Sequence, residues 1–308
     1  MRTVLKASAE KLLRGAGVPR FARRRRRGRT MILAYHNIIP DGAAAGGDTS
    51  LHLARDAFAR QLDRLERTHE VVPLGALFAA PSTSRRPRAV ITFDDAYQGA
   101  LTAGIEELGR RGLPATIFIT PAFIGGRSFW WDALAHPTEG LADHVRRHGL
   151  EALCGRDEMV RRWAVAHGLP VNTVPAHQTA ATEAQLSAAA AIPGITFASH
   201  TWSHPNLSRL TGPELDDELA RPLAWLRARF DNVLPWISYP YGLSSPEVRA
   251  RAQALGYEGA LRIDGAWVPA DPARERYALP RLNIPAGVSV AGFELRAAGV
   301  PMRMRARG

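Results

Sequence analysis

The stretch Ala89-Val-Ile-Thr-Phe93 decides the fold, and two acidic residues, Asp94 and Asp95, follow it directly. All five residues are apolar or β-branched, which is typical of a strand buried on both faces of a parallel sheet. In parallel α/β folds the functional side chains collect at the carboxyl ends of the strands. A surface turn would also accept two aspartates, but a run of buried-type residues seldom leads into one. Asp94 and Asp95 are therefore candidate site residues.

Short apolar segments and helical patterns alternate along the rest of the chain. Further strands are predicted at residues 31–36, 115–120, 195–199, 236–239, 258–262 and 279–284. Helices are predicted at residues 53–69, 97–111, 213–229 and 245–255. This alternation predicts a parallel α/β sheet, either open or closed into a barrel.

One segment departs from the alternation. About 70 residues separate the strand at 115–120 from the strand at 195–199, far more than a usual crossover connection needs. The segment contains Phe129-Trp-Trp-Asp132 and helix-like pieces near 141–148, 156–167 and 182–191. It predicts a helical insertion near 127–192 on the rim of the site, and it does not require a second domain.

The composition of the 308 residues bounds the class of protein. Hydrophobic residues make up 46% and charged residues 22%, a balance typical of a globular chain with its own core. No run reaches the roughly 18 apolar residues that a transmembrane helix needs. The single cysteine, Cys154, excludes an internal disulfide framework and any cysteine-rich zinc site.

The net charge of +11 lies at the two ends of the chain. Residues 1–30 hold eleven Lys or Arg against one acid, Glu10, and the last fourteen residues add four Arg. The remaining body is slightly acidic, which argues against a nucleic-acid channel through it. We expect a body at 31–290 between a basic N-terminal segment, 1–30, and a basic C-terminal tail, 291–308.

The N-terminal segment is either a solvated basic tail or an amphipathic helix. Apolar residues recur there at roughly helical spacing among basic ones, at Val4, Leu5, Ala9, Leu12 and Leu13. Such a helix could lie on an anionic membrane surface, with Arg23 to Arg27 adding attraction. No apolar signal-peptide core follows Arg2 and Lys6. The expectation is a cytoplasmic protein, with peripheral contact at the inner membrane left open.

Two further motifs follow predicted strands. In His200-Thr-Trp-Ser-His204 the two histidines are four residues apart, so both can reach one metal ion from a single helical turn. With an aspartate they make a set of two histidines and one carboxylate, the usual ligands of a catalytic zinc site that keeps a position open for water. Ser238-Tyr-Pro-Tyr-Gly242 could be a structural turn, or it could aim a backbone N–H into the pocket.

In this order, the motifs resemble the polysaccharide deacetylases of carbohydrate esterase family 4, the NodB homology domain. Thr92-Phe-Asp-Asp95 matches the first motif, and His200 to His204 with Asn206 and Leu207 matches the second. Tyr239-Pro-Tyr-Gly242 resembles the third. The resemblance covers about residues 31–285 and implies a distorted (β/α) TIM-like barrel of seven strands.

The sequence also departs from the family pattern. Ala96 stands where the family usually has Gly, Ser238 stands where the third motif begins with Arg, and no histidine follows His204. These gaps are similar to a permuted branch, the exopolysaccharide N-deacetylases, in which Tyr35-His36-Asn-Ile38 and Leu279-Pro-Arg-Leu282 would match an early and a late motif. Arg281 would then replace the missing arginine. A structural histidine at a strand end and a surface arginine remain the alternatives for His36 and Arg281.

The resemblance implies a metal centre. Asp95, His200 and His204 would hold a divalent ion, zinc first, with cobalt or nickel as alternatives. Asp94 would accept a proton from the attacking water, and His36 would donate one to the departing amine.

The resemblance also implies substrate contacts. The backbone N–H of Tyr241 would share the oxyanion with the metal. Tyr239 and Pro240 would contact the substrate. Three tryptophans are either sugar-stacking surfaces or core residues, namely Trp130, Trp131 and Trp202.

The function implied is removal of the N-acetyl group from a sugar in a polysaccharide or glycan precursor. An O-deacetylase or a deformylase acting on a related glycan would use nearly the same chemistry, and an inactive glycan-binding version of the fold is a further alternative. The expected partner is an N-acetylated glycan and not a nucleic acid, and the oligomeric state stays open.

Overall fold

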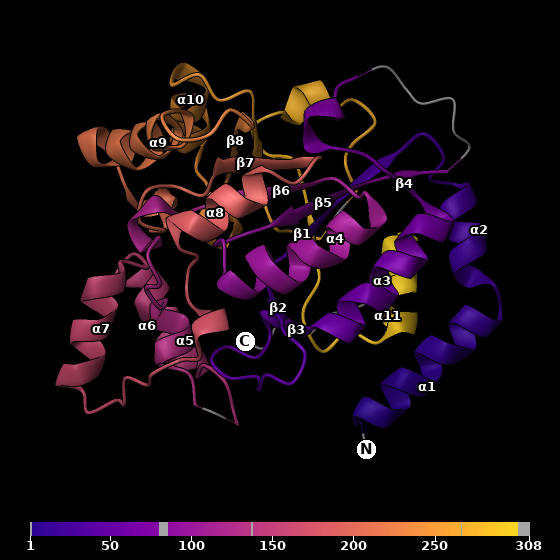
Figure 1. Cartoon of the computed structure of the whole chain (residues 1–308), viewed down its shortest axis with the longest axis horizontal. Coiled ribbons are helices and arrows are strands. Elements are labelled where there is room, and N and C mark those ends of the chain that lie inside the picture. Colours follow the sequence, from indigo (N-terminus) through magenta and orange to yellow (C-terminus); the bar gives the residue numbers. More distant parts are fainter. Residues whose placement is uncertain (1, 80–85, 137, 266, 301–308) are drawn as a thin grey trace.

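A strongly curved parallel sheet forms the centre of the computed structural model, with helices around its outer face (Figure 1). The structure describes residues 2–79, 86–136, 138–265 and 267–300, with side chains from residue 8 onward. Within these residues seven parallel strands follow one another in the order β10-β1-β5-β6-β7-β8-β9, and a short strand, β4, pairs with β5. The strands are β1 Thr30–Tyr35, β4 Glu70–Val71, β5 Arg88–Phe93, β6 Ala115–Ile119, β7 Ile195–Ser199, β8 Val233–Ser238, β9 Gly259–Leu261 and β10 Leu282–Asn283.

Backbone hydrogen bonds join the two edges of this sheet. Leu279, just before β10, donates its N–H to the carbonyl of Ala260 at 3.0 Å and accepts from the N–H of Arg262 at 2.8 Å. Because β10 itself pairs with β1, the segment connects β9 back to the start of the sheet. The predicted seven-stranded barrel is therefore confirmed, in a distorted form whose last strands are short.

The helices and smaller elements complete the outer layer. The helices are α1 Arg2–Gly15, α2 Val18–Arg24, α3 Arg55–Thr68, α4 Ile105–Arg111, α5 Trp130–Ala133, α6 Asp143–Glu151, α7 Asp157–Ala166, α8 Glu183–Ala190, α9 Gly212–Arg227, α10 Pro246–Ala254 and α11 Val290–Ala297. A π-helical segment, Ala100–Gly104, precedes α4, and 3-10 turns lie at Leu74–Ala76, Pro121–Phe123, Ala176–Gln178, Leu207–Arg209, Pro240–Gly242 and Pro272–Glu275. A separate pair of strands, β2 Asn37–Ile39 and β3 His52–Ala54, runs parallel beside the barrel.

The predicted insertion is real but shorter than expected. Helices α5, α6 and α7 lie together below the sheet in Figure 1, away from the ring of covering helices. Helix α8 instead packs against β7, with Leu186 and Ala189 buried in the same core as the sheet. It is the crossover helix between β6 and β7, so the insertion ends before α8 and not at residue 192.

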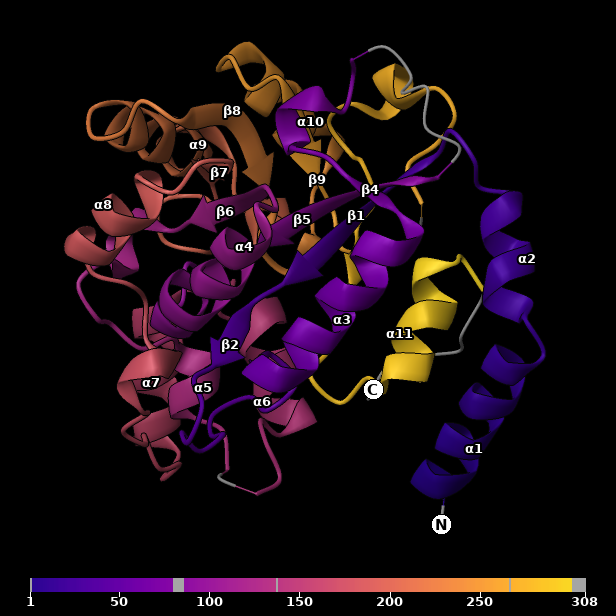
Figure 2. The same ribbon diagram turned by 45° about the vertical axis from the view of Figure 1, so that its right-hand side comes forward.

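The first and last helices of the described residues pack together on one side of the body, where α1 lies beside α11 (Figures 1 and 2). The prediction of a basic tail from residue 291 is wrong as far as Ala297, because Phe293 and Leu295 on α11 are buried in the body. Residues 301–308 lie outside the described residues. The N-terminal segment is helical, as one of its two interpretations predicted, and the side chains of Val4 and Leu5 lie outside the described ones. No helix in the described part of the chain has the length and apolarity to cross a bilayer.

Candidate active site

Alternate residues of each strand point into the barrel, and this alternation determines what lies at its mouth. The interior is filled by one or more side chains from each wall, including Ile32, Val90, Phe118, Ala198, Trp236 and Leu279. Counting onward by twos along the strands reaches polar residues at or just after the strand ends, namely His36, Asp94, His200, Ser238 and Arg281. The same register that builds the core therefore delivers these side chains to the carboxyl end of the barrel.

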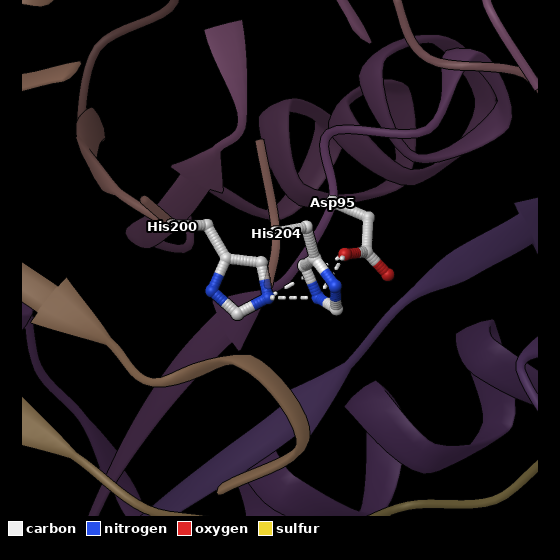
Figure 3. A group of neighbouring side chains, drawn as sticks. All are labelled: Asp95, His200 and His204. Atoms are coloured by element: carbon white, nitrogen blue, oxygen red, sulfur yellow. Dashed lines mark hydrogen bonds and ion pairs between the residues drawn. The ribbon is translucent and has the colours of Figure 1, made fainter. Parts of the chain in front are cut away.

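Three predicted metal ligands meet at this mouth (Figure 3). Asp95 Oδ1 lies 3.4 Å from His200 Nε2 and 3.3 Å from His204 Nε2, and the two ring nitrogens are 3.1 Å apart. A tetrahedral zinc ion with ligand bonds of about 2.0–2.1 Å needs ligand atoms roughly 3.3 Å apart. Asp95 Oδ1 is buried and accepts no hydrogen bond from any described residue. The donor set therefore fits a divalent ion in both spacing and chemistry.

The surrounding protein orients these three side chains. The carbonyl of Ser238 accepts a hydrogen bond from His200 Nδ1 at 2.7 Å, which orients the ring so that Nε2 faces the site. Burial, together with the neighbouring His200, lowers the pKa of His204 to about 3, so its ring stays neutral. Asp95 and His204 have left-handed φ angles of 68° and 61°, an uncommon conformation for such residues that clusters at functional sites. The turn after Asp94 brings Asp95 into the mouth although it breaks the alternation of β5.

Asp94 is clamped by Arg281, 187 residues away in the sequence. The guanidinium donates from Nη1 to Asp94 Oδ1 at 2.8 Å and from Nη2 to Asp94 Oδ2 at 2.6 Å. It also donates to Thr92 Oγ1 and to Ser238 Oγ, and it has no exposed surface. Burial alone would raise the pKa of Asp94, but the charge of Arg281, the neighbouring His200 and the hydrogen bonds from Arg281 together outweigh it and hold that pKa well below the usual range. The surface alternative for Arg281 is therefore wrong.

His36 is half-buried and lines the same cavity as Asp94 and Asp95. Within the described residues its ring makes no hydrogen bond, so it is not a structural histidine with a fixed partner. Burial lowers its pKa, and the charges of Asp95 and Asp94 act in the opposite direction. The ring is thus a titratable group that is free to face a substrate.

Tyr241 turns the chain after β8 with a left-handed φ of 58°. Its ring packs edge-on against His204 at 4.6 Å, and its hydroxyl accepts a hydrogen bond from Trp130 Nε1 at 3.3 Å. No described residue accepts a hydrogen bond from its backbone N–H. The residue lines the cavity, so the N–H is available for an oxyanion there.

The site opens into a cavity of about 440 Å³, large enough for a sugar residue. Trp131 lines this cavity and packs against His204 at 4.8 Å between ring centroids. Trp130 and Tyr239 have no exposed surface and Pro240 is buried, so the expected substrate contact is wrong for these three. Trp202 lines a different cavity, between α7 and α9, with Arg221 stacked over its ring at 4.0 Å.

The structure adds residues that the motifs did not reveal. Asp48 and Arg146, on the loop before β3 and on α6, form an ion pair at the wall of the cavity. Asp132 accepts hydrogen bonds from the N–H of Asp48 at 2.8 Å and from the Tyr97 hydroxyl at 2.7 Å. His52 Nε2 lies 2.9 Å from the same carboxylate. Buried carboxylates need such partners, and Asp132 in Phe129-Trp-Trp-Asp132 was a signal that could have been followed.

A family model described as polysaccharide deacetylase matches residues 82–260, more than half of the chain. No curated protein sequence matches this chain. The matched segment contains both of the motifs that carry Asp94, Asp95, His200 and His204. The resemblance predicted from these motifs is confirmed.

Solved deacetylases of low sequence identity share the fold. The deacetylase PplD of Streptococcus pyogenes is 17% identical, with a TM-score of 0.58 over 86% of this chain and 96% of that one. A de-N-acetylase of Aggregatibacter actinomycetemcomitans is 14% identical, with a TM-score of 0.59 over 87% and 99%. IcaB of Ammonifex degensii is 15% identical, with a TM-score of 0.56 over 89% and 97%. The family model, the motifs and the barrel agree with one another. The chain therefore belongs to the polysaccharide deacetylase family, whose members are hydrolases that remove acetyl groups from glycans.

Proposed function

We propose that this chain removes the acetyl group from the nitrogen of an N-acetylated sugar with the help of a divalent metal ion, for which zinc is the first candidate. The observation that carries the proposal is the buried triangle of Asp95, His200 and His204, with sides of 3.1–3.4 Å. Beside it stand an ionised Asp94 and a histidine without a fixed partner, His36. The name of the de-N-acetylase with the same fold supports the choice of an N-acetyl group.

The metal would supply a water molecule of lowered pKa and would polarise the acetyl carbonyl. Asp94 is oriented by Arg281, and its Oδ1, which accepts one hydrogen bond from the described residues, keeps a second lone pair that can take the proton of the attacking water. The water oxygen bonds to the acetyl carbon, and the N–H of Tyr241 stabilises the negative charge that develops on the carbonyl oxygen.

The carbon–nitrogen bond then breaks, and a proton must reach the nitrogen because an amide anion is a very poor leaving group. His36 lines the cavity and would donate that proton, so the products are acetate and a free amine. An O-acetyl group needs this help less, since an alkoxide leaves more readily. The presence of a histidine in this place supports N-deacetylation over O-deacetylation.

The proposal is tested by acetate release from matched N-acetylated and O-acetylated glycans, with the metal content of the protein measured in parallel. We expect about one divalent ion per chain, loss of activity in excess chelator, and recovery on adding zinc or cobalt. His204→Gln should lose the ion, whereas His167→Gln, an exposed histidine just after α7, should keep it. Full activity in excess chelator, or unchanged metal content in His204→Gln, would contradict the proposed metal site. Acetate release from the O-acetylated glycans alone would show that the chain is an O-deacetylase and not an N-deacetylase.

A further inference from the structure

Helices α1 and α2 are fixed to the body of the protein. Glu10 is buried and accepts a hydrogen bond from Ser289 Oγ, the cap of α11, at 2.6 Å. Arg14 pairs with Glu294 on α11 at 2.9 Å. Figure 2 shows α1 and α2 along one edge of the molecule, beside α11 and α3. The basic N-terminal segment therefore presents one defined face to solvent.

The outer side of this face is apolar. Leu12 is 74% exposed and Phe21 59%, and Leu13 beside them is 39% exposed. At 100° per residue Leu12 points away from Glu10 and Arg14, which bind α11. Exposed large apolar side chains near one another mark interaction surfaces more often than single ones do.

Cations surround these apolar residues without acidic partners. Exposed basic side chains that form no ion pair with any described residue are Lys11, Arg20, Arg24, Arg25 and Arg27. A cavity between these helices and α3 is lined by Arg14, Arg20, Arg23, Arg64 and Arg67, and Glu294 is the only carboxylate among the described residues that line it. The body is slightly acidic, whereas residues 1–30 hold eleven Lys or Arg against one acid, so this face is strongly basic.

We infer that α1, α2 and this arginine-lined cavity form a docking face for an anionic lipid bilayer. The arginines match the phosphate headgroups, and Leu12 and Phe21 enter the boundary between headgroups and acyl chains. Duplex nucleic acid also offers phosphates, but it gives no apolar layer to two exposed side chains, and this favours the bilayer. The inference is independent of the reaction, because none of these residues lines the catalytic cavity.

The full chain is tested by sedimentation with phosphatidylcholine vesicles, pure or containing phosphatidylglycerol, at low and high salt. We expect binding only to the anionic vesicles and weaker binding at high salt. Arg20→Glu with Arg24→Glu should weaken it by about 30-fold or more, since each basic residue near the surface contributes about 1 kcal/mol. Leu12→Glu with Phe21→Glu should weaken it by about tenfold or more.

The matched control is Met159→Glu with Val165→Glu on α7, two exposed apolar residues on another part of the molecule. It should bind vesicles like the wild type, and every variant should keep its circular dichroism spectrum and its release of acetate from a soluble substrate. Equal binding to both kinds of vesicle, or equal weakening in the control, would overturn the inference. So would tight binding to a short DNA duplex that Leu12→Glu with Phe21→Glu leaves unchanged while vesicles do not bind.

Discussion

Replacing Arg281 with methionine should destabilise the protein strongly. Methionine keeps an unbranched side chain of similar length but removes the charge that pairs with Asp94. The Asp94 carboxylate would stay buried with one remaining side-chain donor, Ser238 Oγ at 3.3 Å. Removing one partner of a buried ion pair costs about 3–5 kcal/mol, because the other charge is left uncompensated. We expect a loss of that size in the free energy of unfolding, measured by urea denaturation.

The same exchange at an exposed pair is the matched control. Arg251 also faces a single carboxylate, that of Asp216, but both side chains are substantially exposed. Arg251→Met should cost less than about 1 kcal/mol. Arg281→Met in an Asp94→Asn background should also cost about 1–3 kcal/mol less than in the wild type, because no carboxylate is left unpaired. Equal losses for the two arginines, or no coupling with Asp94, would refute the reasoning.

The pH dependence gives an independent measure of the clamp. The pKa of Asp94 is lower in the folded protein than the value of about 3.9 in an unfolded chain, because Arg281 and the neighbouring His200 together outweigh burial. Its stabilisation is therefore complete above about pH 4 and is lost as the pH falls through the folded pKa. Arg281→Met removes the largest of the contributions that oppose burial, so that pKa rises and the acid limb of acetate release moves to higher pH. If the acid limb of acetate release stayed at its wild-type pH, Asp94 would not be the group whose protonation limits the reaction.

The other predictions concern single residues. Asp94→Asn should keep the metal and lower turnover by about 10²–10⁴, whereas Asp95→Asn should lose both metal and turnover; equal metal loss would mean that base and ligand have been confused. His36→Ala should lower kcat by about 10²–10⁴ with the metal retained, and by less on an activated ester; near-wild-type turnover on an N-acetylated sugar would exclude His36 as the acid. His69 is buried and its pKa is lowered to about 3, so its neutral ring stabilises the fold fully above about pH 6.5 and progressively less as the pH falls toward 3. His69→Gln should therefore flatten the fall of the unfolding free energy below pH 6.5 by up to about 1.4 kcal/mol per pH unit, and His167→Gln, an exposed histidine, should not.

The sequence was sufficient for the barrel and for most of the polar residues at its mouth. Strands buried on both faces have apolar residues throughout, so β5 and β6 were visible without any contact information. The alternation of side chains then leads from Thr92 to Asp94 and from Ala198 to His200, the residues directly after β5 and β7. Arg281 follows the same rule from Leu279, but in the sequence only the late motif Leu279-Pro-Arg-Leu282 indicated it, because its partner Asp94 is 187 residues away.

Other features depend on side-chain packing, which the periodicity of the sequence does not predict. The aromatic residues of Phe129-Trp-Trp-Asp132 are equally apolar in the sequence, yet Trp131 faces the cavity while Trp130 is fully buried. The choice is made by their neighbours, since Trp131 packs on His204 and Trp130 donates to the Tyr241 hydroxyl. The C-terminal helix depends on packing in the same way. Four arginines give the last residues their basic character, whereas α11 is bound to the body by only a few apolar residues, which form no clear helical pattern in the sequence.

The insertion takes part in forming the site, because a buried carboxylate ties it to the barrel. Asp132 on α5 accepts hydrogen bonds from Tyr97, just after the first motif, and from the backbone of Asp48. The Tyr97 hydroxyl in turn accepts from Trp131 Nε1 at 2.8 Å, so the ring beside His204 is held from its far side. A buried charge with several donors is costly to disturb, so it fixes the relative positions of the groups that surround it. The wall of the cavity and His204 are thus positioned by one network, which spans the first motif and the insertion.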